Sequence, residues 1–561
     1  MHKRLLFLTL LKATLFANTV FCQNSLVKKG NEQYDKFEYI NAQKTYLKAV
    51  KKGYQSADLY EKLANCYYFN SQFKDAARWY TELIITYPDQ IKAEYYFRYA
   101  QTLKSTGRYQ EADIYMGKFI ESNPNDYRAY LYKRNKDYLK KIEGQSHRCT
   151  ITNLPLNSPY SDFGTAFFGQ QLIFSSSRAK GKSHDDVHQW NKEPYLDLYI
   201  AVPDPNNNQL FKVKKWDNIF NGFFHESTPV FTKDMKTVYF TRNSEKGSKE
   251  NVNNHVITTD KLQIFRSRMN KRGKWGKPKP LPFNNNLYST AHPALNAREN
   301  KLYFSSDMPG GFGGPDLYEV DINPDGSFGT PRNLGNKINT EGKETFPFIS
   351  QNDDLYFASD GHVGLGGLDI YVTSLKNNIP GEENIILNLG KPINSPADDF
   401  AFIIDVKNNS GYFSSNRSEG KGKDDIYSFV DFDPLKKGDD LAKILDLNPI
   451  YFDLDKSFIR PDAARELDKV INIMKQYPNI KIDIRSHTDS RASHYYNIKL
   501  SERRARSTRN YIVNKGGIDQ KRLTWRGYGE TQLLNHCSDG VYCNEDDHQL
   551  NRRSEFIIIE Q

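Results

Sequence analysis

The stretch HTDSRASHYYNIKLSERRARS, residues 487–507, sets a single aspartate in front of a segment rich in arginine. Arg504 follows Asp489 by fifteen residues. The spacing of apolar residues predicts a helix from about residue 493 to residue 515, and Gly516 and Gly517 follow it as stop signals. Asp489 is therefore expected in the loop before the helix, and Arg504 on the helix itself.

One face of this predicted helix carries a single arginine. The positions that recur at steps of three and four, and so share the face, are Asn497, Leu500, Arg504, Thr508 and Tyr511. Arg503, Arg506 and Arg509 point elsewhere. A guanidinium on the same stripe as Leu500 should be partly desolvated, so it needs a carboxylate partner from the protein or from a ligand. Asp489 is the clearest candidate within the protein.

The sequence around this stretch predicts a compact α+β domain over residues 447–561. A helix begins at Pro461. Its apolar stripe consists of Ala464, Leu467, Ile471 and Met474. Strands are expected at residues 449–455, 481–487, 522–529 and 554–560.

Four motif blocks of this domain resemble the OmpA-type peptidoglycan-binding domain. They are YFDLDKSFIRPDA (451–463), the segment 487–518, RLTWRGYGE (522–530) and NRRSEF (551–556), and the resemblance covers about 115 residues. It implies that Asp489 and Arg504 hold diaminopimelate of the stem peptide. That ligand end is zwitterionic, so its ammonium requires an anion and its carboxylate a planar fork. The resemblance also implicates Asp455, Thr488, Asn497, Leu500 and an arginine of the NRR block, where Arg553 is preferred to Arg552.

Structural alternatives stay open for these residues. Asp489 and Arg504 could form an internal salt bridge without a ligand, and Thr488 and Leu500 could serve in packing or capping. Many relatives place a glycine shortly after the TD pair, whereas this chain has Ser490, Arg491 and Ala492. The shape of that loop is therefore less firmly predicted than the two charged residues.

The cysteines point to an oxidising compartment. Cys537 and Cys543 stand six residues apart in the polar segment CSDGVYC, where a disulfide is favoured. A metal site is the alternative because His536 and His548 flank the pair, but the spacing matches no familiar zinc pattern. Cys66 lies in an apolar helical pattern and is expected in the core. The sequence thus predicts one disulfide, no metal and no cofactor.

Residues 1–22 have basic residues followed by an apolar run, the layout of a secretory signal peptide. Lipidation of Cys22 is the alternative, although a lipoprotein would carry a small residue where Phe21 stands. Later stretches fall short of the roughly 18 to 20 apolar residues of a membrane span. The formal net charge of +10 is spread along the chain and does not indicate nucleic-acid binding. We expect a periplasmic protein associated with the outer membrane and peptidoglycan.

Residues 23–146 repeat a helical frame about every 34 residues. Between Tyr60 and Pro88 the chain reads as two helices, with small residues at Ala64 and Ala76 that let them approach closely. The frame recurs 36 residues later and 34 residues earlier, where it begins at Gly30. This pattern resembles the tetratricopeptide repeat, an all-α solenoid whose concave face binds partner proteins.

Residues 150–432 repeat a strand phrase instead. The five copies are LIFSSSR, VYFTRN, LYFSSD, LYFASD and GYFSSNR, with Phe174, Phe240, Phe304, Phe357 and Phe413 as their central aromatics. Several short strands per unit, repeated at 53 to 66 residues, are typical of propeller blades, and the region resembles WD-repeat-like, TolB-type β-propellers. We expect five blades, or six if the ends near 150 and 432 close another. Residues 433–446 form the predicted linker.

The order of these modules resembles PorE-type envelope proteins of Bacteroidota, which tether type IX secretion and gliding machinery to peptidoglycan. The leading hypothesis is a non-enzymatic scaffold that binds peptidoglycan and holds outer-membrane or periplasmic proteins on its repeats and propeller. HExxH, Walker and G-x-S-x-G motifs are missing from the sequence, so no catalytic residue is predicted. The alternatives are a propeller-based hydrolase and a carrier of a periplasmic glycan or peptide.

Overall fold

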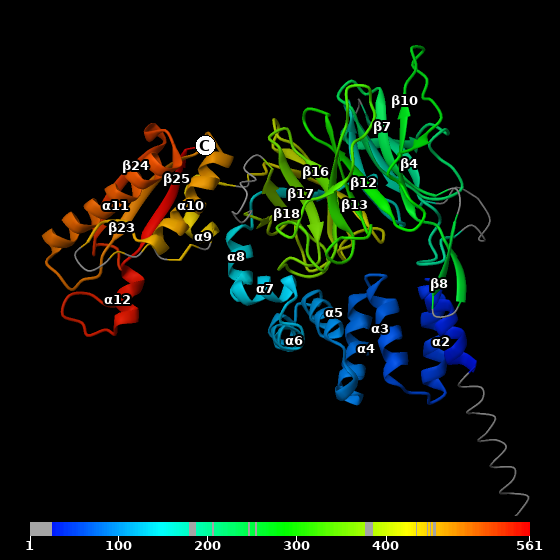
Figure 1. The fold of residues 1–561 in the computed structure, drawn as a ribbon, viewed down its shortest axis with the longest axis horizontal. Helices are drawn as coiled ribbons and strands as arrows, with labels where there is room; N and C mark the ends of the chain where they lie inside the picture. The colour runs from blue at the N-terminus through cyan, green and yellow to red at the C-terminus, as the bar shows by residue number, and fades with distance from the viewer. Residues whose placement is uncertain are drawn as a thin grey trace, which may run out of the picture.

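The computed structural model describes residues 25–178, 187–204, 207–244, 247–252, 255–375, 385–433, 435–445, 447–448, 450, 452 and 456–560. The predicted signal peptide, Cys22 and Asp455 lie outside this part. Three regions follow one another along the chain: helices, a group of small antiparallel sheets, and a C-terminal α/β domain (Figure 1). The helices lie below the sheets and the C-terminal domain lies to one side (Figure 1).

The N-terminal region consists of consecutive helices packed on one another. Residues 25–35 are helical. The helices that follow are α2 (Tyr39–Lys51), α3 (Ala57–Tyr68), α4 (Phe73–Thr86), α5 (Ala93–Lys104), α6 (Tyr109–Ser122), α7 (Tyr127–Arg134) and α8 (Tyr138–Gly144), with a short 3₁₀ turn η1 (Pro88–Gln90). Strong pairwise contacts join α3 to α4 and α5 to α6. Ala64, Ala76 and Cys66 are fully buried in this core, as the spacing predicts.

Small residues set how closely these helices approach. A Cβ built on Gly30 would lie 2.5 Å from Cε1 of Tyr46, a fully buried tyrosine of α2. Any side chain at position 30 would therefore push the Tyr46 ring out of its place. The Tyr46 hydroxyl in turn donates to Asn31 Oδ1 at 2.7 Å, which fixes the ring against the first helical segment.

Five four-stranded antiparallel sheets make up the middle region. The first four are β2-β3-β4-β5, β6-β7-β10-β11, β12-β13-β14-β15 and β16-β17-β18-β19. The fifth joins both ends of the region, because β1 pairs with β22 in the order β1-β22-β21-β20. The five repeated phrases lie on the second strand of each sheet, and their central phenylalanines are buried. The ends near 150 and 432 complete the fifth sheet, so the described residues contain no sixth one.

The strand bounds of this region are as follows. The strands are β1 (Thr150–Asn153), β2 (Asp162–Phe168), β3 (Gln171–Ser176), β4 (Asp197–Asp204), β5 (Asn207–Lys215), β6 (Glu226–Phe231), β7 (Thr237–Asn243), β10 (Leu262–Arg268), β11 (Lys279–Pro280), β12 (Thr290–Leu295), β13 (Lys301–Ser306), β14 (Asp316–Asp321), β15 (Arg332–Asn333), β16 (Glu344–Ile349), β17 (Asp354–Ser359), β18 (Asp369–Ser374), β19 (Leu387–Asn388), β20 (Asp399–Asp405), β21 (Ser410–Ser415) and β22 (Asp425–Val430). A separate hairpin pairs β8 (Ser248–Val252) with β9 (His255–Thr259).

The first strands of the five sheets contact one another in a closed cycle: β2 with β6, β6 with β12, β12 with β16, β16 with β20, and β20 with β2. Each of them has an irregular register in its middle. At this irregularity the backbone has a positive φ, at Gly164, Thr228, His292, Phe346 and Ala401. Three of these residues donate their backbone N–H to a hydroxyl of the neighbouring sheet: Gly164 to Ser414, Thr228 to Ser175 and His292 to Thr241. The hydrogen bonds made at these irregular positions therefore join adjacent sheets.

The C-terminal domain contains α9 (Leu441–Ile444), α10 (Pro461–Gln476), β23 (Lys481–His487), α11 (His494–Gly516), η2 (Gln520–Arg522), β24 (Leu523–Gly529), α12 (Glu545–Asn551) and β25 (Ser554–Glu560). Its sheet has the order β24-β23-β25, with β23 parallel to β24 and antiparallel to β25. The expected helices and three of the expected strands are present. Of the strand predicted at 449–455, the structure describes only Ile450 and Phe452, and neither is in a strand.

Specific contacts join the three regions. Gln101 of α5 donates to the carbonyl of Asp360, and Ser71 donates to Asp398 at 2.5 Å. Arg148, which is buried, pairs with Asp439 at 2.6 Å and so connects the sheet region to the C-terminal domain. Within the predicted linker, Gly438 donates to Ile558 of β25. None of the helices in the described residues is both long and apolar enough to cross a membrane.

Candidate functional site

Asp489 follows β23, the central strand of the C-terminal sheet, and so lies at one end of that sheet. The preceding residues are fixed by backbone bonds, since His487 donates to the carbonyl of Arg553 and Thr488 donates to the carbonyl of Gly529, both at 2.9 Å. These bonds come from opposite neighbours of the central strand. Asp489 is 8% exposed, so it lies in a mostly buried position.

Two guanidinium groups bind the Asp489 carboxylate. Arg491 Nη2 lies 2.7 Å and Arg552 Nη1 lies 2.6 Å from Oδ2 of Asp489. Burial raises the pKa of Asp489, but the bonds from Arg491 and Arg552 outweigh burial and hold the pKa below its ordinary value. Asp489 is therefore ionised at neutral pH.

Arg504 lies on α11 and is almost completely buried, with 4% exposure. Its Nε donates to the carbonyl of Lys456 at 3.2 Å, and its guanidinium carbon lies 5.0 Å from the centre of the Phe452 ring. Burial lowers the pKa of Arg504 to about 10, against the opposing charge of Asp489. The charge of Asp489 thus acts on Arg504, but among the described residues the ion pairs of Asp489 are made with Arg491 and Arg552 and not with Arg504. Arg503 and Arg506 are exposed, as the helical phase predicts.

The other predicted residues lie around this pair. Asn497 donates from Nδ2 to the carbonyls of Asp489 at 3.1 Å and Ala492 at 3.0 Å, so it shapes the loop from the helix side. Leu500 is 7% exposed and packs in the same face. Thr488 is 2% exposed, and its hydroxyl is buried without a hydrogen-bond partner in the described part of the chain.

The NRR block contributes two neighbouring arginines with different partners. Arg552 reaches Asp489, whereas Arg553 pairs with Glu555 at 2.8 Å and donates to the carbonyl of Gln532 at 3.0 Å. Both line a cavity of only about 10 Å³, together with Ile450, Phe452, His487, Arg504 and Gln549. That volume is room for about one water, and Asp489 is not among the residues that line the cavity.

The loop that lacks the usual glycine does not need one. Residues 490–492 are all described, and none of them has a positive φ. Ser490 donates from Oγ to the carbonyl of Cys537 at 2.7 Å, and Ser493 caps α11 by accepting the N–H of Tyr496. Ala492 is therefore compatible with this loop.

Cys537 and Cys543 form a disulfide. His536 lies beside them, with Nε2 3.8 Å from Cys543 Sγ. Zinc binds cysteine as the thiolate, and both sulfurs are used in the covalent bond, so the metal alternative does not apply to this pair. The disulfide instead closes the segment that leads into α12.

Two residues of this neighbourhood were not predicted from the sequence. Arg491 and Glu545 form an ion pair at 2.8 Å, and Glu545 also pairs with Arg552 at 2.5 Å. Glu545 is the first residue of α12 and follows Asp489 by 56 residues. Its acidic segment NEDD was visible in the sequence, but the packing that brings it to Asp489 was not.

Comparisons with known proteins agree on this domain. Residues 451–545 match the model of the OmpA family. Outer membrane porin F of Pseudomonas aeruginosa is 39% identical over 83 residues, which are 15% of this chain and 24% of that protein. The peptidoglycan-associated lipoprotein of Rhizobium meliloti is 38% identical over 90 residues, 16% of this chain and 51% of that one.

Among solved structures, the peptidoglycan-associated lipoprotein from Burkholderia pseudomallei aligns with 22% identity and a TM-score of 0.19, over 20% of this chain and 92% of that one. The chain spans about half or less of the length of the curated relatives it matches. The C-terminal region is an OmpA-like domain.

Proposed function

We propose that this protein binds peptidoglycan through its C-terminal domain, with Asp489 and Arg504 holding diaminopimelate of the stem peptide. The observation that carries the proposal is the position of Arg504: a guanidinium 4% exposed on an inward helix face, within the electrostatic reach of the buried Asp489 carboxylate. In the described part of the chain, Asp489 forms its ion pairs with Arg491 and Arg552 and not directly with Arg504, so a ligand with two opposite charges can bridge Asp489 and Arg504.

The chemistry of the two groups fits a zwitterion. Asp489 is ionised and can accept from an ammonium, while Arg504 can donate two parallel bonds to a carboxylate. A ligand with only one of the charges would make a charge-assisted bond at one end only, which selects against it. Asp455, Thr488, Asn497 and Leu500 are proposed to complete the site, together with an arginine of the NRR block. Arg552 is favoured over Arg553 because Arg552 is the one that pairs with Asp489. The relatives that match include proteins named for their association with peptidoglycan, which supports the same ligand.

The other regions are proposed to hold partner proteins. The helix pairs support assignment as tetratricopeptide repeats, and the five sheets with their closed cycle of first strands support assignment as a five-bladed β-propeller. We propose no catalytic role for these regions. The protein then acts as a scaffold between peptidoglycan and outer-membrane or periplasmic proteins, and its module order favours type IX secretion or gliding machinery.

The test is co-sedimentation of the full chain with purified peptidoglycan sacculi. Asp489→Asn and Arg504→Met keep the side-chain size while removing the charge. Arg506→Met, an exposed arginine half a turn along α11, is the matched control. We expect the wild type and the control to sediment with sacculi and the two site variants to remain in the supernatant. Equal sedimentation of all four proteins would refute the proposed site.

A further inference from the structure

Four charged side chains form a closed ring at the edge of the candidate site. Arg491 lies 2.7 Å from Asp489 and 2.8 Å from Glu545. Arg552 lies 2.6 Å from Asp489 and 2.5 Å from Glu545. Each arginine therefore bonds both carboxylates, and each carboxylate bonds both arginines. The predicted binding pair uses only one member of this ring, Asp489.

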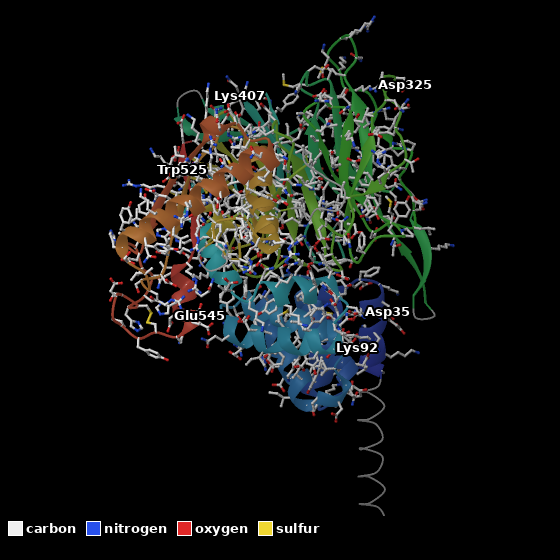
Figure 2. All side chains as sticks on the ribbon, turned by 60° about the vertical axis from the view of Figure 1, so that its left-hand side comes forward. Asp35, Lys92, Asp325, Lys407, Trp525 and Glu545 are labelled. Atoms are coloured by element: carbon white, nitrogen blue, oxygen red, sulfur yellow. A yellow bond between two sulfur atoms is a disulfide. The ribbon has the colours of Figure 1, made fainter. Side chains whose placement is uncertain are left out.

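The two carboxylates of the ring differ in environment. The Asp489 side chain is 12% exposed, whereas the Glu545 side chain is 64% exposed and lies on α12 at the surface (Figure 2). Asp489 is the inner, fixed member and Glu545 the outer one. Ion pairs of an exposed carboxylate contribute little in water, because the carboxylate is well solvated when it is released. Glu545 can thus leave the arginines at small cost, while Asp489 stays.

Without Glu545, the outer faces of Arg491 and Arg552 would present two guanidinium groups to solvent. A planar guanidinium group can bind a carboxylate through two parallel bonds because its donor spacing matches the two oxygens, as it also matches phosphate. Within the ring, the two positive charges of Arg491 and Arg552 balance the two negative charges of Asp489 and Glu545. Release of Glu545 would leave one positive charge in excess beside a proposed ligand that carries carboxylates.

The disulfide fixes the backbone of the segment that carries Glu545. Cys543 is bonded to Cys537, whose carbonyl accepts the hydroxyl of Ser490, the residue after Asp489. Asn544 follows and caps α12 by accepting the N–H of Asp547 at 2.8 Å, so Glu545 begins the helix in a defined position. The loop that carries Asp489 and the helix that carries Glu545 are therefore tied together.

We propose that Arg491 and Arg552 form a carboxylate-binding subsite in which Glu545 is the resident, internal carboxylate, and that a carboxylate of the bound stem peptide takes its place. This inference rests on the proposed peptidoglycan binding. Glu545 then acts as a built-in competitor that lowers the affinity of the site and makes it selective for a free carboxylate over an amide.

The experiment compares the full-length wild type with Glu545→Gln and Asp546→Asn. Glutamine keeps the size of Glu545 and removes the competing charge. Asp546 is an exposed acid on the same helical turn and makes no ion pair in the described residues, so it controls for net charge. Binding is measured by titration calorimetry with a stem tripeptide that ends in diaminopimelate. The peptide is used first with both diaminopimelate carboxylates free. It is then used with the carboxylate at the end of the peptide chain converted to an amide, while the carboxylate proposed to bind Arg504 stays free.

We expect Glu545→Gln to bind the free acid about threefold to tenfold more tightly than Asp546→Asn, as the loss of exposed ion pairs allows. With the amide, the two variants should bind alike. If Glu545→Gln binds the free acid no better than Asp546→Asn, or more weakly, the competitor role is wrong. The proposed function still holds in that case if the wild type binds and the Asp489→Asn variant does not. A wild type that binds neither peptide nor sacculi would overturn both.

Discussion

Arg552 places Nη1 2.6 Å from Oδ2 of Asp489, although 63 residues separate them in the sequence. The sheet explains the contact. β25 runs antiparallel to β23 with Ser554 opposite Ser486. Asp489, which follows β23, and Arg552, which precedes β25, therefore meet at the same end of the sheet. The neighbouring Arg553 turns to Glu555 on the strand itself. The register of β23 and β25 thus decides which arginine of the NRR block faces Asp489.

This difference between adjacent arginines predicts different effects of their removal. Arg552→Met should weaken binding to sacculi about tenfold to a hundredfold, because a charged hydrogen bond contributes about 1.5–3 kcal/mol. Arg553→Met should change binding less than threefold, since its partners Glu555 and Gln532 belong to the scaffold. Quantitative pelleting of the two variants checks this. A larger loss for Arg553→Met would show that Arg553 is the binding residue, as the sequence alone suggested.

The disulfide is predicted to stabilise the segment before α12. In the chain-entropy description, closing a loop of this size contributes about 2 kcal/mol. Reduction, or the double substitution Cys537→Ser with Cys543→Ser, should therefore speed hydrogen–deuterium exchange across residues 536–551. Cys149→Ser is the control because Cys149 is a free cysteine outside this domain. Unchanged exchange after reduction would contradict a role for the bond in holding Glu545.

A buried glutamate predicts a pH-dependent stability of the sheet region. Glu344 is fully buried, and burial raises its pKa to about 8 although Ser359 and Thr340 donate to it. Between the ordinary pKa of a glutamate and about pH 8, the folded protein keeps a proton on Glu344 that the unfolded chain has released. The free energy of unfolding is therefore greatest below the ordinary pKa and declines as the pH rises toward 8, by at most a few kcal/mol.

Glu344→Gln should remove this part of the pH dependence, because the amide can accept from Thr340 and donate to the hydroxyls without titrating. The measurement is the free energy of unfolding from denaturant titrations between pH 5 and pH 8, with the exposed Glu121→Gln as the control. If the difference between wild type and Glu344→Gln is the same at both ends of the range, Glu344 is ionised throughout and the prediction fails.

Two glycines of the helical region should respond in opposite ways to alanine. Gly30→Ala puts a Cβ against the Tyr46 ring and is expected to destabilise the region by about 1–3 kcal/mol. Gly117 lies within α6 with no atom within 4 Å of its added Cβ, so Gly117→Ala should stabilise by about 0.5–1 kcal/mol. Thermal unfolding followed by circular dichroism compares them. Equal shifts would mean that close packing at Gly30 is not what places this helix.

The sequence predicted those parts of the fold that depend on local periodicity. The stripe of α11 was correct: Asn497, Leu500, Arg504 and Thr508 are all buried, because a 3.6-residue period fixes which side chains share a face. The pairing of Cys537 with Cys543 was also predictable, since a short loop brings them together. The five phrases marked the second strands of five sheets because the phrase itself recurs around a buried phenylalanine, although these strands are buried along nearly their whole length and do not alternate.

What the sequence could not supply was the meeting of distant segments. The ring of Asp489, Arg491, Glu545 and Arg552 depends on strand register and on the loop that the disulfide closes, and neither has a local periodic signal. The closing of the fifth sheet by β1 likewise joins residues more than 270 positions apart, as in the pair Thr150 and Val430. Asp455 stays a prediction because it lies outside the described residues.

The most direct test of the central claim is binding to two kinds of sacculi that differ at one residue of the stem peptide. One kind carries diaminopimelate at the third position and the other carries lysine, which lacks the second carboxylate. We predict that the full chain sediments with the diaminopimelate sacculi and binds the lysine sacculi at least about tenfold more weakly, because Arg504 loses its partner. Equal binding to both would contradict the assignment of Asp489 and Arg504 to a zwitterionic ligand.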